Sequence, residues 1–501
     1  MELSASFVLK AIAVGAFQYF IIRTIYNLFF HPLKSYPGPR ALAASQLPMI
    51  YANITGQAPL WALRFHKKYG PVVRMAPNEL SYSDSSSWRD IYGSNQARPA
   101  GMARDPAFYE PWDDKNSAPS LVNTSDRDHA RIRRVYAKAF SKQALSEQEP
   151  LIFEHITQLI GKIYKEHHQP IDIVDILAFT ITDINIDLQF GEPLHLLNDT
   201  THHMWVKNQS AYVRGAKVLE ALAELPFIKT IFQLALPKLA KHAQAVHFGL
   251  LNNKLDHRLA SRPDRPDFVH FLVGDNGPGA KLSEAELRAN VPVIMIGQTE
   301  TTTAALSGLI ALLLEAPHFL RQLQEEVRST FRTRSDINSA AMEKMKVLNA
   351  CINETLRIYP PVPGALPRIV PRGGAMISGN WVPAGTRVYT SSLATCHSSE
   401  NFHDPDSFLP QRWYPGSEER FAQDVQAALK PFSVGTKDCI GQPIAYYILR
   451  LITCELVLHF DLEPYTESKI WFSRQRIWTV WNKGPLLVKF TPVHVKRYGD
   501  N

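Results

Sequence analysis

The sequence predicts a mainly α-helical protein with small β-sheets. Residues 127–331 show a mainly helical pattern, and 282–317 is the longest helical stretch, apolar all round in its middle. Strand-like alternation is confined to short segments, namely 70–84, 373–392 and the C-terminal end. With 45% hydrophobic and 20% charged residues, the composition is that of a folded chain rather than a disordered one. A chain of 501 residues can bury a large core around these helices.

The N-terminus is the first element along the chain. Residues 7–30 are mostly apolar and about as long as the roughly 20 residues that cross a bilayer. A cleaved signal peptide is the alternative, although its apolar region would be shorter. By the positive-inside rule the body lies on the cytosolic side, because most basic residues lie near or beyond the C-terminal end of this segment. These are Arg23, His31, Lys34 and Arg40, whereas Lys10 alone lies near its N-terminal end. We expect a membrane anchor over 1–30, a proline-rich hinge over 31–40 and one folded domain over 41–501.

Local signals mark the elements that follow the hinge. Two short strands are expected around a turn at Pro77 and Asn78. Ser283 and Glu286 form a capping box that begins the long helix, and Pro317 ends it.

The C-terminal third alternates between helix and strand patterns. A helix over 342–358 should end before Pro360. Strands are expected over 373–392, with Gly379 and Asn380 as the turn. A helix from about 443 to 458 precedes short strands that run to the end of the chain.

Charge, cysteine usage and missing motifs narrow the function. The net charge of +7, from 54 basic and 47 acidic residues, is mild, and no basic and aromatic interleaving suggests nucleic acid. The four cysteines include no C-x-x-C pair, which favours a reducing compartment over a disulfide framework. The chain contains no P-loop, G-x-G-x-x-G, G-x-S-x-G or H-E-x-x-H motif. A nucleotide, serine-hydrolase or zinc-protease function therefore has no support.

The stretch PFSVGTKDCIGQPIA places a single thiol, Cys439, between two glycines and in front of a helix. Gly435 and Gly441 allow tight backbone turns and a close approach to a flat object. Pro443 suits the first turn of a helix, so Cys439 precedes a helix N-terminus, which favours a thiolate. Such a thiolate is what a haem iron ligand requires. The alternative is a buried structural cysteine.

This stretch resembles the haem-binding signature of the cytochrome P-450 family, F-x-x-G-x-[RH]-x-C-x-G. Phe432, Gly435, Cys439 and Gly441 match it, and Lys437 stands where arginine is usual. The resemblance implies that Cys439 is the axial ligand of the haem iron, and that the other residues hold the cofactor. Lys437 would reach a haem propionate as a point charge, or turn outward toward a redox partner.

Two further motifs of the family precede the cysteine. The segment NETLR gives Glu354 and Arg357 on one helix face, and FLPQRW supplies Arg412. By itself a Glu–Arg pair at this spacing is usually a surface ion pair. The resemblance implies a buried network of the three residues that locks the coil leading to Cys439.

The long helix carries a fourth motif, GQTETT, which resembles [AG]-G-x-[DE]-T-[TS]. It places Glu300 beside Thr301, and the resemblance implies that this acid–alcohol pair delivers protons to bound oxygen. Gln298 replaces the usual glycine, so the helix could distort differently there. The alternative is a polar seam between helices.

Two weaker matches concern the haem propionates. HARIRR gives His129 and Arg133, and LPRIV gives Arg368, at positions where the family contacts these carboxylates. The resemblance also implies that a basic patch faces an acidic redox partner: Arg131, Arg134, Lys138 and Lys437.

Together these motifs cover most of the chain and imply a haem-thiolate monooxygenase with the helical prism fold of the family. The implied cofactor is haem b, with electrons from NADPH through a membrane-bound NADPH–cytochrome P-450 reductase, and cytochrome b5 as an optional second donor. The implied location is the endoplasmic reticulum membrane, single-pass, with a cytosolic catalytic domain. An oxygen-independent haem-thiolate isomerase or dehydratase, and a non-catalytic haem sensor, are the alternatives.

The resemblance is greatest to filamentous-fungal members of secondary metabolism, of the isotrichodermin 15-hydroxylase type, on the segments FFHPLKSYPGPR and CIGQPIA. The expected substrate is a lipophilic terpenoid, polyketide or alkaloid. Its pocket should be apolar with aromatic walls, from Phe108, Tyr109, Trp112 and Leu366.

Overall fold

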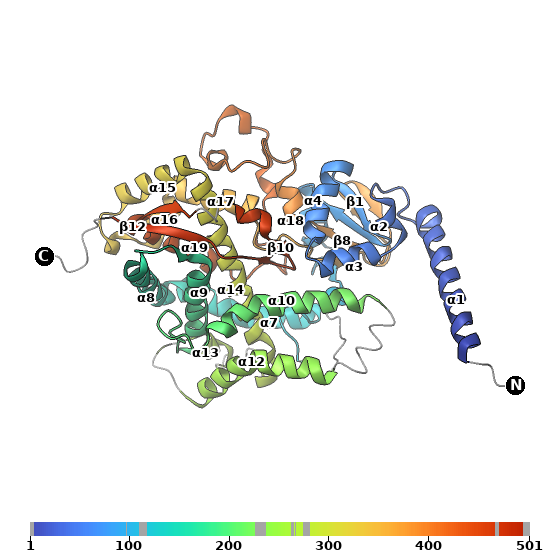
Figure 1. Ribbon diagram of the computed structural model, residues 1–501, viewed down its shortest axis with the longest axis horizontal. Coiled ribbons are helices and arrows are strands. Elements are labelled where there is room, and N and C mark those ends of the chain that lie inside the picture. Colours follow the sequence, from blue (N-terminus) through green and yellow to red (C-terminus); the bar gives the residue numbers. More distant parts are fainter. Residues whose placement is uncertain are drawn as a thin grey trace.

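The computed structural model describes residues 5–96, 98–109, 118–225, 237–261, 265, 267–273, 281–465 and 470–493. The predicted fold class is confirmed, because the chain is mainly helical with four small sheets among these residues. The sheet-rich part and the helical part occupy opposite ends of the body (Figure 1). Trp112, one of the expected pocket residues, lies outside the described residues.

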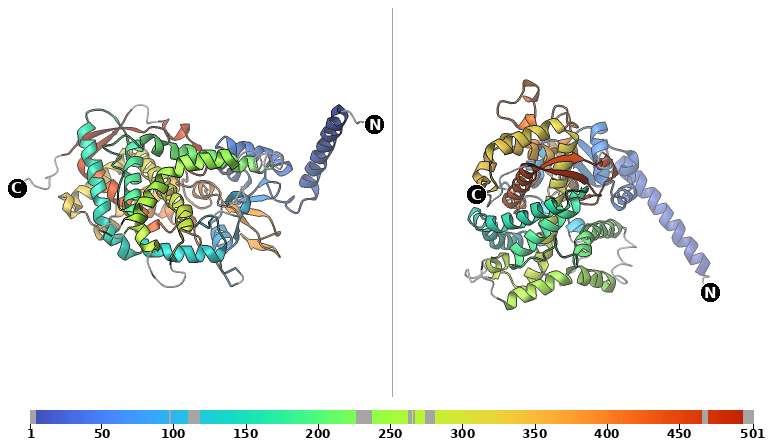
Figure 2. Two further views of the ribbon diagram at one scale, coloured as in Figure 1. Left: turned by 90° about the horizontal axis from the view of Figure 1, so that it is seen from below. Right: turned by 60° about the vertical axis from the view of Figure 1, so that its left-hand side comes forward.

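The N-terminal helix α1 (Ala5–Ile25) stands away from the rest of the molecule in all views (Figures 1 and 2). A π-helical turn, Tyr26–Phe30, continues it toward the body. Several of its apolar side chains are exposed, including Phe17 and Ile22. Within the described part of the chain, no single helix is both long and apolar enough to span a membrane. One sharply bent pair of helices, α14 (Glu284–Glu315) with α15 (Pro317–Thr330), is long and apolar enough when taken together.

The largest sheet has five strands in the order β1-β2-β8-β5-β3. The predicted strands around Pro77 and Asn78 are β1 and β2, which pair in antiparallel fashion. The sheet lies against the short N-terminal helices (Figure 1). Its strands are β1 (Val72–Ala76), β2 (Glu79–Tyr82), β3 (Ala103–Arg104), β5 (Arg368–Ile369) and β8 (Arg387–Thr390). The helices near it are α2 (Arg40–Ala44), α3 (Leu47–Ile54), α4 (Ala58–Tyr69), α5 (Ser86–Tyr92) and α6 (Pro106–Tyr109).

The middle of the chain is helical, as the sequence predicts. The longest helix, α14 (Glu284–Glu315), begins at the predicted capping box of Ser283 and Glu286 and ends just before Pro317. It stays α-helical through Gln298, so the replacement of glycine introduces no break. The others are α7 (Asp126–Ala139), α8 (Lys142–Glu166), α9 (Ile173–Phe190), α10 (His203–Ala223), α12 (Pro237–Ala260), α13 (Phe268–Val273) and α15 (Pro317–Thr330).

The C-terminal third differs from expectation in two details. The helix expected over 342–358 is divided at Met345 into α16 (Ser339–Lys344) and α17 (Lys346–Ile358). The hairpin of β6 (Ala375–Ile377) and β7 (Asn380–Val382) turns at Ser378 and Gly379, which both have positive φ, one residue earlier than predicted. The remaining elements are α18 (Ser392–Cys396), α19 (Gln442–His459), β9 (Phe460–Pro464), β10 (Arg476–Ile477), β11 (Trp481–Asn482), β12 (Leu487–Pro492) and the short β4 (Ile171–Asp172), which pairs with β12.

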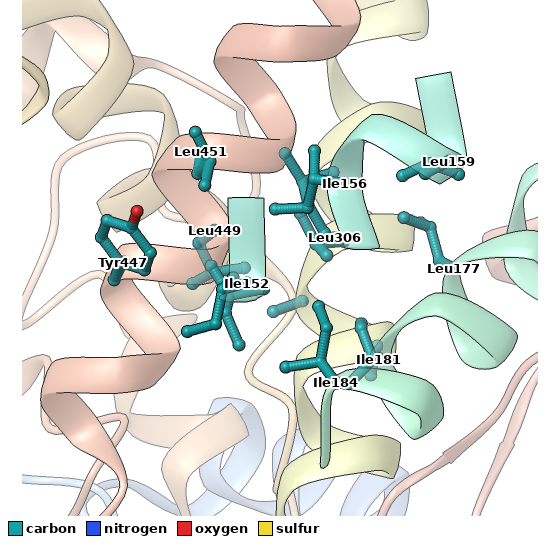
Figure 3. Close-up of a cluster of buried hydrophobic side chains, with 14 of the residues drawn as sticks. Ile152, Ile156, Leu159, Leu177, Ile181, Ile184, Leu306, Tyr447, Leu449 and Leu451 are labelled. Atoms are coloured by element: carbon teal, nitrogen blue, oxygen red, sulfur yellow. The ribbon is translucent and has the colours of Figure 1, made fainter. Parts of the chain in front are cut away.

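The main core lies where α8, α9, α14 and α19 meet (Figure 3). Ile152 and Ile156 of α8 face Leu306 of α14 and Leu449 of α19, and all four are buried. Burying a side chain of this size contributes roughly 1.5–3 kcal/mol. The core therefore holds α14, which carries the predicted acid–alcohol pair, in a fixed relation to α19, which begins just after Cys439.

Candidate functional site

Cys439 lies at the end of a loop that the backbone closes tightly. Its N–H donates to the carbonyl oxygen of Phe432 at 2.9 Å, and α19 begins three residues later, after Gly441. Ser433 and Gly435 both have positive φ, which gives the loop its two sharp turns. Phe432 packs against Tyr446 of α19, with ring centroids 5.2 Å apart. The thiol is thus presented from a rigid loop at a helix N-terminus.

The two glycines of the loop, Gly435 and Gly441, differ in whether the surrounding protein requires a glycine at that position. Gly435 has φ +85°, and a Cβ there would lie 2.1 Å from the carbonyl oxygen of Tyr92 in α5. The close neighbour of Gly435 is therefore the protein's own backbone. A Cβ at Gly441 would meet only ordinary contacts, at 3.8 Å from the Cys439 sulfur and 3.9 Å from Phe140. Nothing in the described chain therefore demands glycine at 441, and the backbone there is open to a neighbouring group.

The pKa of the Cys439 thiol is set by more than the helix end that the sequence indicates. Burial raises the pKa of Cys439 above its usual value, although the backbone N–H groups of Gly441 and Gln442 lower it in part. The Cys439 side chain is nevertheless accessible, so a bound group can reach the sulfur. A bound metal ion would supply the missing stabilisation, because coordination deprotonates a thiol.

No group of three His, Cys, Asp or Glu side chains that could hold a metal ion occurs among the described residues. A single cysteine side chain at the end of a loop suits a prosthetic group that brings its other metal ligands with it. A haem does so, and needs one axial side chain from the protein.

A buried cationic cluster supplies the second half of the fit. Arg104 of β3 and Arg368 of β5 are paired directly across the two strands, and Arg368 is buried. Like charges opposite one another destabilise a sheet. Moreover, Nε and Nη1 of Arg104 are buried without a hydrogen-bond partner in the described structure. Burial lowers the pKa of Arg104 to about 10, and the charge of Arg368 adds to this effect.

Three more basic residues approach the same place. Lys437 is buried, with Nζ 2.8 Å from both the Ala100 carbonyl oxygen and Asp126. Burial lowers the pKa of Lys437 despite its bond to Asp126, and Arg368 and Arg104 act in the same direction. His129 is also buried, and burial with the charges of Arg104, Arg133 and Lys437 lowers its pKa to about 4.

The cluster formed by Arg104, His129, Arg133, Arg368 and Lys437, hereafter the cationic cluster, contains more positive charge than the protein neutralises. Asp126 is the carboxylate that bonds to Lys437, and Arg133 bonds to the backbone oxygen and the carboxylate of Asp438. Arginine matches carboxylates well, and buried unpaired charge is costly. Two haem propionates would supply the missing anions. The residues present therefore fit haem b.

Arg104 was not predicted from the sequence. No motif marks it, and only the pairing of β3 with β5 brings it opposite Arg368. The side chain of Arg368 itself donates to the Tyr109 hydroxyl and to the carbonyl oxygens of Leu366 and Pro367.

The structure brings Glu354, Arg357 and Arg412 together in the interior. Arg357 donates twice to Glu354, at 2.9 and 2.7 Å, and Arg412 donates to it at 3.1 Å. Trp413 Nε1 and the N–H of Leu409 complete the bonds to the carboxylate. Burial alone would raise the pKa of Glu354, but Arg357 and Arg412 hold it below its usual value.

The same arginines hold the coil that follows α18. Arg357 donates to the carbonyl oxygens of Cys396, Pro405 and Ser407, and Arg412 donates to that of His403. Arg412 also pairs with Asp424. The network thus fixes the long coil that leads toward Cys439, as the resemblance implies.

The acid–alcohol pair on α14 points in two directions. The Thr301 hydroxyl donates to the carbonyl oxygen of Gly297, one turn earlier, and both residues are accessible although they lie in mid-helix. Glu300 is buried and accepts hydrogen bonds from Ser210 of α10 and from Lys483. Both polar atoms of Gln298 are buried without a partner among the described residues.

A small cavity of about 50 Å³ lies between the largest sheet, α10 and the segment around Trp478. Of the expected pocket residues Phe108 lines this cavity, whereas Tyr109 and Leu366 do not, and its other apolar walls come from Pro363, Ala365 and Trp478. The rest of the lining is charged, with Lys217 and Glu220 of α10 and the ion pair of Arg387 with Glu224. The pocket is therefore less apolar than the sequence argument supposed.

The predicted basic patch is smaller than expected. Lys437 is buried rather than outward-facing, and Arg131 pairs with Glu286 and Asp128. Arg134 and Lys138 of α7 remain exposed. Nearby, Cys439 borders a groove of about 620 Å³ that is also lined by Arg133, Lys142 and Arg450.

Comparisons with known proteins agree with this geometry. A family model described as "Cytochrome P450" matches residues 49–490. Cytochrome P450 monooxygenase aneG of Aspergillus aculeatus is 41% identical over 475 residues, which cover 95% of this chain and 89% of that protein. Cytochrome P450 monooxygenase efuB of Hormonema carpetanum is 40% identical, with 94% of each chain covered. Averantin hydroxylase of Dothistroma septosporum is 36% identical over 506 residues, covering 100% of this chain and 95% of that protein.

Proposed function

The chain belongs to the cytochrome P450 family and is a monooxygenase, and on this premise we propose its reaction, electron supply, location and substrate class. The reaction is the insertion of one oxygen atom from O2 into a lipophilic small molecule of fungal secondary metabolism. The family relationship covers 95% of the chain in its match to aneG. The observation that carries the proposal is the cationic cluster, whose excess positive charge the two carboxylates of haem b would neutralise.

Haem b would be held between Cys439 and the cationic cluster. Cys439 would ligate the iron, while Arg104, Arg368 and Lys437 would bind the propionates. Gly441 leaves room for a flat group, since a Cβ there would meet only ordinary contacts from the protein. When bound, the haem supplies oxygen activation, and a thiolate ligand favours cleavage of the O–O bond.

Glu300 and Thr301 would move protons to the reacting oxygen. A carboxylate and a hydroxyl in consecutive positions of a buried helix can pass a proton from water to a bound group. The Thr301 hydroxyl lies on the accessible side of α14, and Glu300 lies beside it. The presence of this pair favours oxygen chemistry over an isomerase or a haem sensor.

Electrons would come from NADPH through the membrane-bound NADPH–cytochrome P-450 reductase, with cytochrome b5 as an optional second donor. The groove beside Cys439 gives the shortest approach to the ligand sulfur. Exposed Arg134 and Lys138 of α7 lie near it and suit an acidic partner.

The chain would be anchored in the endoplasmic reticulum membrane through its N-terminus. Helix α1 stands apart from the body and exposes large apolar side chains, including Phe17 and Ile22. The proline-rich segment 31–40 then connects this anchor to a catalytic domain on the cytosolic side.

The substrate would be an aromatic polyketide or a molecule of similar size and shape. The cavity combines Phe108 and Trp478 with charged groups at its edge, which suits a flat molecule with polar substituents. One of the relatives is named as a hydroxylase of averantin.

The direct test is reconstitution with reductase, NADPH and isotopically labelled O2 in the presence of candidate fungal polyketides and terpenoids. We expect a product that contains one labelled oxygen atom and forms only when NADPH is present. Conversion without NADPH or O2 would instead support an isomerase or dehydratase. Haem binding without conversion of any substrate in such a panel would support a sensor.

A further inference from the structure

Lys483 is a buried lysine with one carboxylate partner. It lies between β11 and β12, near the C-terminus, and its side chain is 5% exposed. Its Nζ is 2.8 Å from Oε2 of Glu300, whose side chain is 7% exposed. A longer contact, 3.4 Å, joins Nζ to the carbonyl oxygen of Trp481. The position of this ammonium group is therefore determined by Glu300.

Three separate elements meet at the Glu300 carboxylate. Glu300 lies in the middle of α14, Ser210 on α10, and Lys483 on the C-terminal segment. The Ser210 hydroxyl is 2.9 Å from both carboxylate oxygens, so it adds a neutral donor to the charged one. The lysine and the serine together fix both the direction and the charge of the carboxylate.

The direction they impose separates Glu300 from Thr301. Consecutive residues of an α-helix point about 100° apart, since a turn contains 3.6 residues. Thr301 bonds within α14 to Gly297, whereas Glu300 reaches outward to α10 and to Lys483. The contacts with Ser210 and Lys483 thus point the carboxylate away from the Thr301 hydroxyl, although the two residues are consecutive in α14.

We propose that Lys483 is a positioning residue for the oxidation reaction, which pairs with the buried Glu300 carboxylate and fixes the direction from which this group takes part in proton delivery. This role rests on the proposed function of Glu300. Removal of one partner leaves an uncompensated charge in the interior, and such a group becomes protonated instead. A protonated Glu300 could no longer accept a proton from water.

The elements that carry the two donors also line the substrate cavity. Ser210 lies on the same helix as Lys217 and Glu220, and Lys483 follows Trp478 and Thr479 by a few residues. A substrate that shifts α10 or the C-terminal segment would therefore change the hydrogen bonds of Glu300. Lys483 thus connects the occupancy of the cavity with the supply of protons.

The test compares Lys483→Met with Lys483→Arg in the full-length holoenzyme. Infrared spectroscopy reports whether a carboxyl group is protonated, independently of turnover. We expect a new band of a protonated carboxylic acid in Lys483→Met, and no such band in Lys483→Arg, which keeps the positive charge. The band should disappear in Lys483→Met/Glu300→Gln. Lys162→Met, which removes a lysine from a partly exposed ion pair on α8, is the control and should show no band.

Turnover provides the second measurement. With reductase, NADPH and no added substrate, we expect the hydrogen peroxide formed per NADPH to change by about tenfold in Lys483→Met, which is less than the roughly 100- to 10,000-fold that a proton-transferring group itself contributes, and by less than about twofold in Lys483→Arg. An unchanged infrared spectrum together with unchanged peroxide formation in Lys483→Met would overturn the proposal. A new infrared band without any effect on peroxide would show that Lys483 holds Glu300 but that Glu300 does not deliver protons, which contradicts the function proposed for Glu300.

If Lys483→Met does not bind haem, the double variant carries the test. Lys483→Met/Glu300→Gln contains no unpaired charge and should fold. Its peroxide formation should equal that of Glu300→Gln, because Lys483 acts only through Glu300. A further change of more than about threefold in the double variant would contradict the role of Lys483 as a positioning residue.

Discussion

Two buried groups of arginines differ in how they are neutralised. In the Glu354 network, Arg357 and Arg412 use their N–H groups on one carboxylate and on backbone oxygens, and the group is complete by itself. In the cationic cluster, Arg104 faces Arg368 across the sheet and two of its N–H groups have no partner among the described residues. The Glu354 network therefore stabilises the fold, whereas the cationic cluster is suited to bind a negatively charged ligand. The distinction between a structural and a functional site follows from this difference in pairing.

The largest expected effect comes from breaking the complete network. Glu354→Gln leaves Arg357 and Arg412 with a neutral partner in the interior, which should cost about 3–5 kcal/mol of unfolding free energy. We expect apoprotein or insoluble protein, measured by the yield of haem-loaded chain. Glu166→Gln, in the partly exposed pair with Lys162, should cost less than about 1 kcal/mol. A fully haem-loaded Glu354→Gln protein would show that the network is dispensable.

The two glycines of the cysteine loop provide a smaller version of the same comparison. Gly435→Ala should destabilise the chain by about 2–4 kcal/mol with or without haem, because of its positive φ and its contact with Tyr92. Gly441→Ala should change the stability of the apoprotein by less than about 0.5 kcal/mol and weaken haem binding.

Urea unfolding of the apoprotein, together with haem titration, measures both effects. Equal losses of apoprotein stability in the two variants would contradict the assignment of Gly441 to the ligand.

The smallest expected effect is a pH dependence of the cationic cluster. The pKa of His129 is about 4 in the folded chain, against an ordinary value of 6.5, because of burial and the neighbouring charges. As the pH falls below 6.5, His129 binds a proton in the unfolded chain but stays neutral in the folded chain. The free energy of unfolding therefore decreases until about pH 4, where the folded chain also binds the proton. Above pH 6.5, His129 is neutral in both states and contributes no pH dependence.

Haem should reduce this acid sensitivity, because its propionates offset the charges that act on His129. Thermal unfolding of the apoprotein and holoprotein across this pH window measures the difference. His129→Leu should remove most of the dependence in the apoprotein. An acid sensitivity that is equal with and without haem would show that the propionates do not lie near His129.

The features that short motifs specify could be predicted from the sequence. The capping box at Ser283, the helix after Cys439 and the meeting of Glu354 with Arg357 all depend on residues close together in the chain. The spacing of Glu354 and Arg357 fixes a common helix face, and the family resemblance supplied Arg412.

Features that depend on tertiary contacts could not be predicted from the sequence. Arg104 meets Arg368 only because β3 pairs with β5, across more than half of the chain. The direction of Lys437 depends on Ala100 and Asp126, and the pairing of Glu300 depends on Lys483 near the C-terminus. The thiol of Cys439 depends on opposing effects, because desolvation raises its pKa while the N–H groups of Gly441 and Gln442 lower it, and the sequence indicates only the helix end.

The central claim is that the cationic cluster binds the two propionate carboxylates of haem. The most direct test measures the affinity of haem and of its neutral dimethyl ester for the apoprotein and for Arg104→Met, with Arg134→Met as a surface control. We predict that Arg104→Met weakens haem binding by about 10- to 100-fold, the value of a charged hydrogen bond, and leaves the binding of the ester unchanged. An equal loss of affinity for haem and ester, or no loss for either, would contradict the claim.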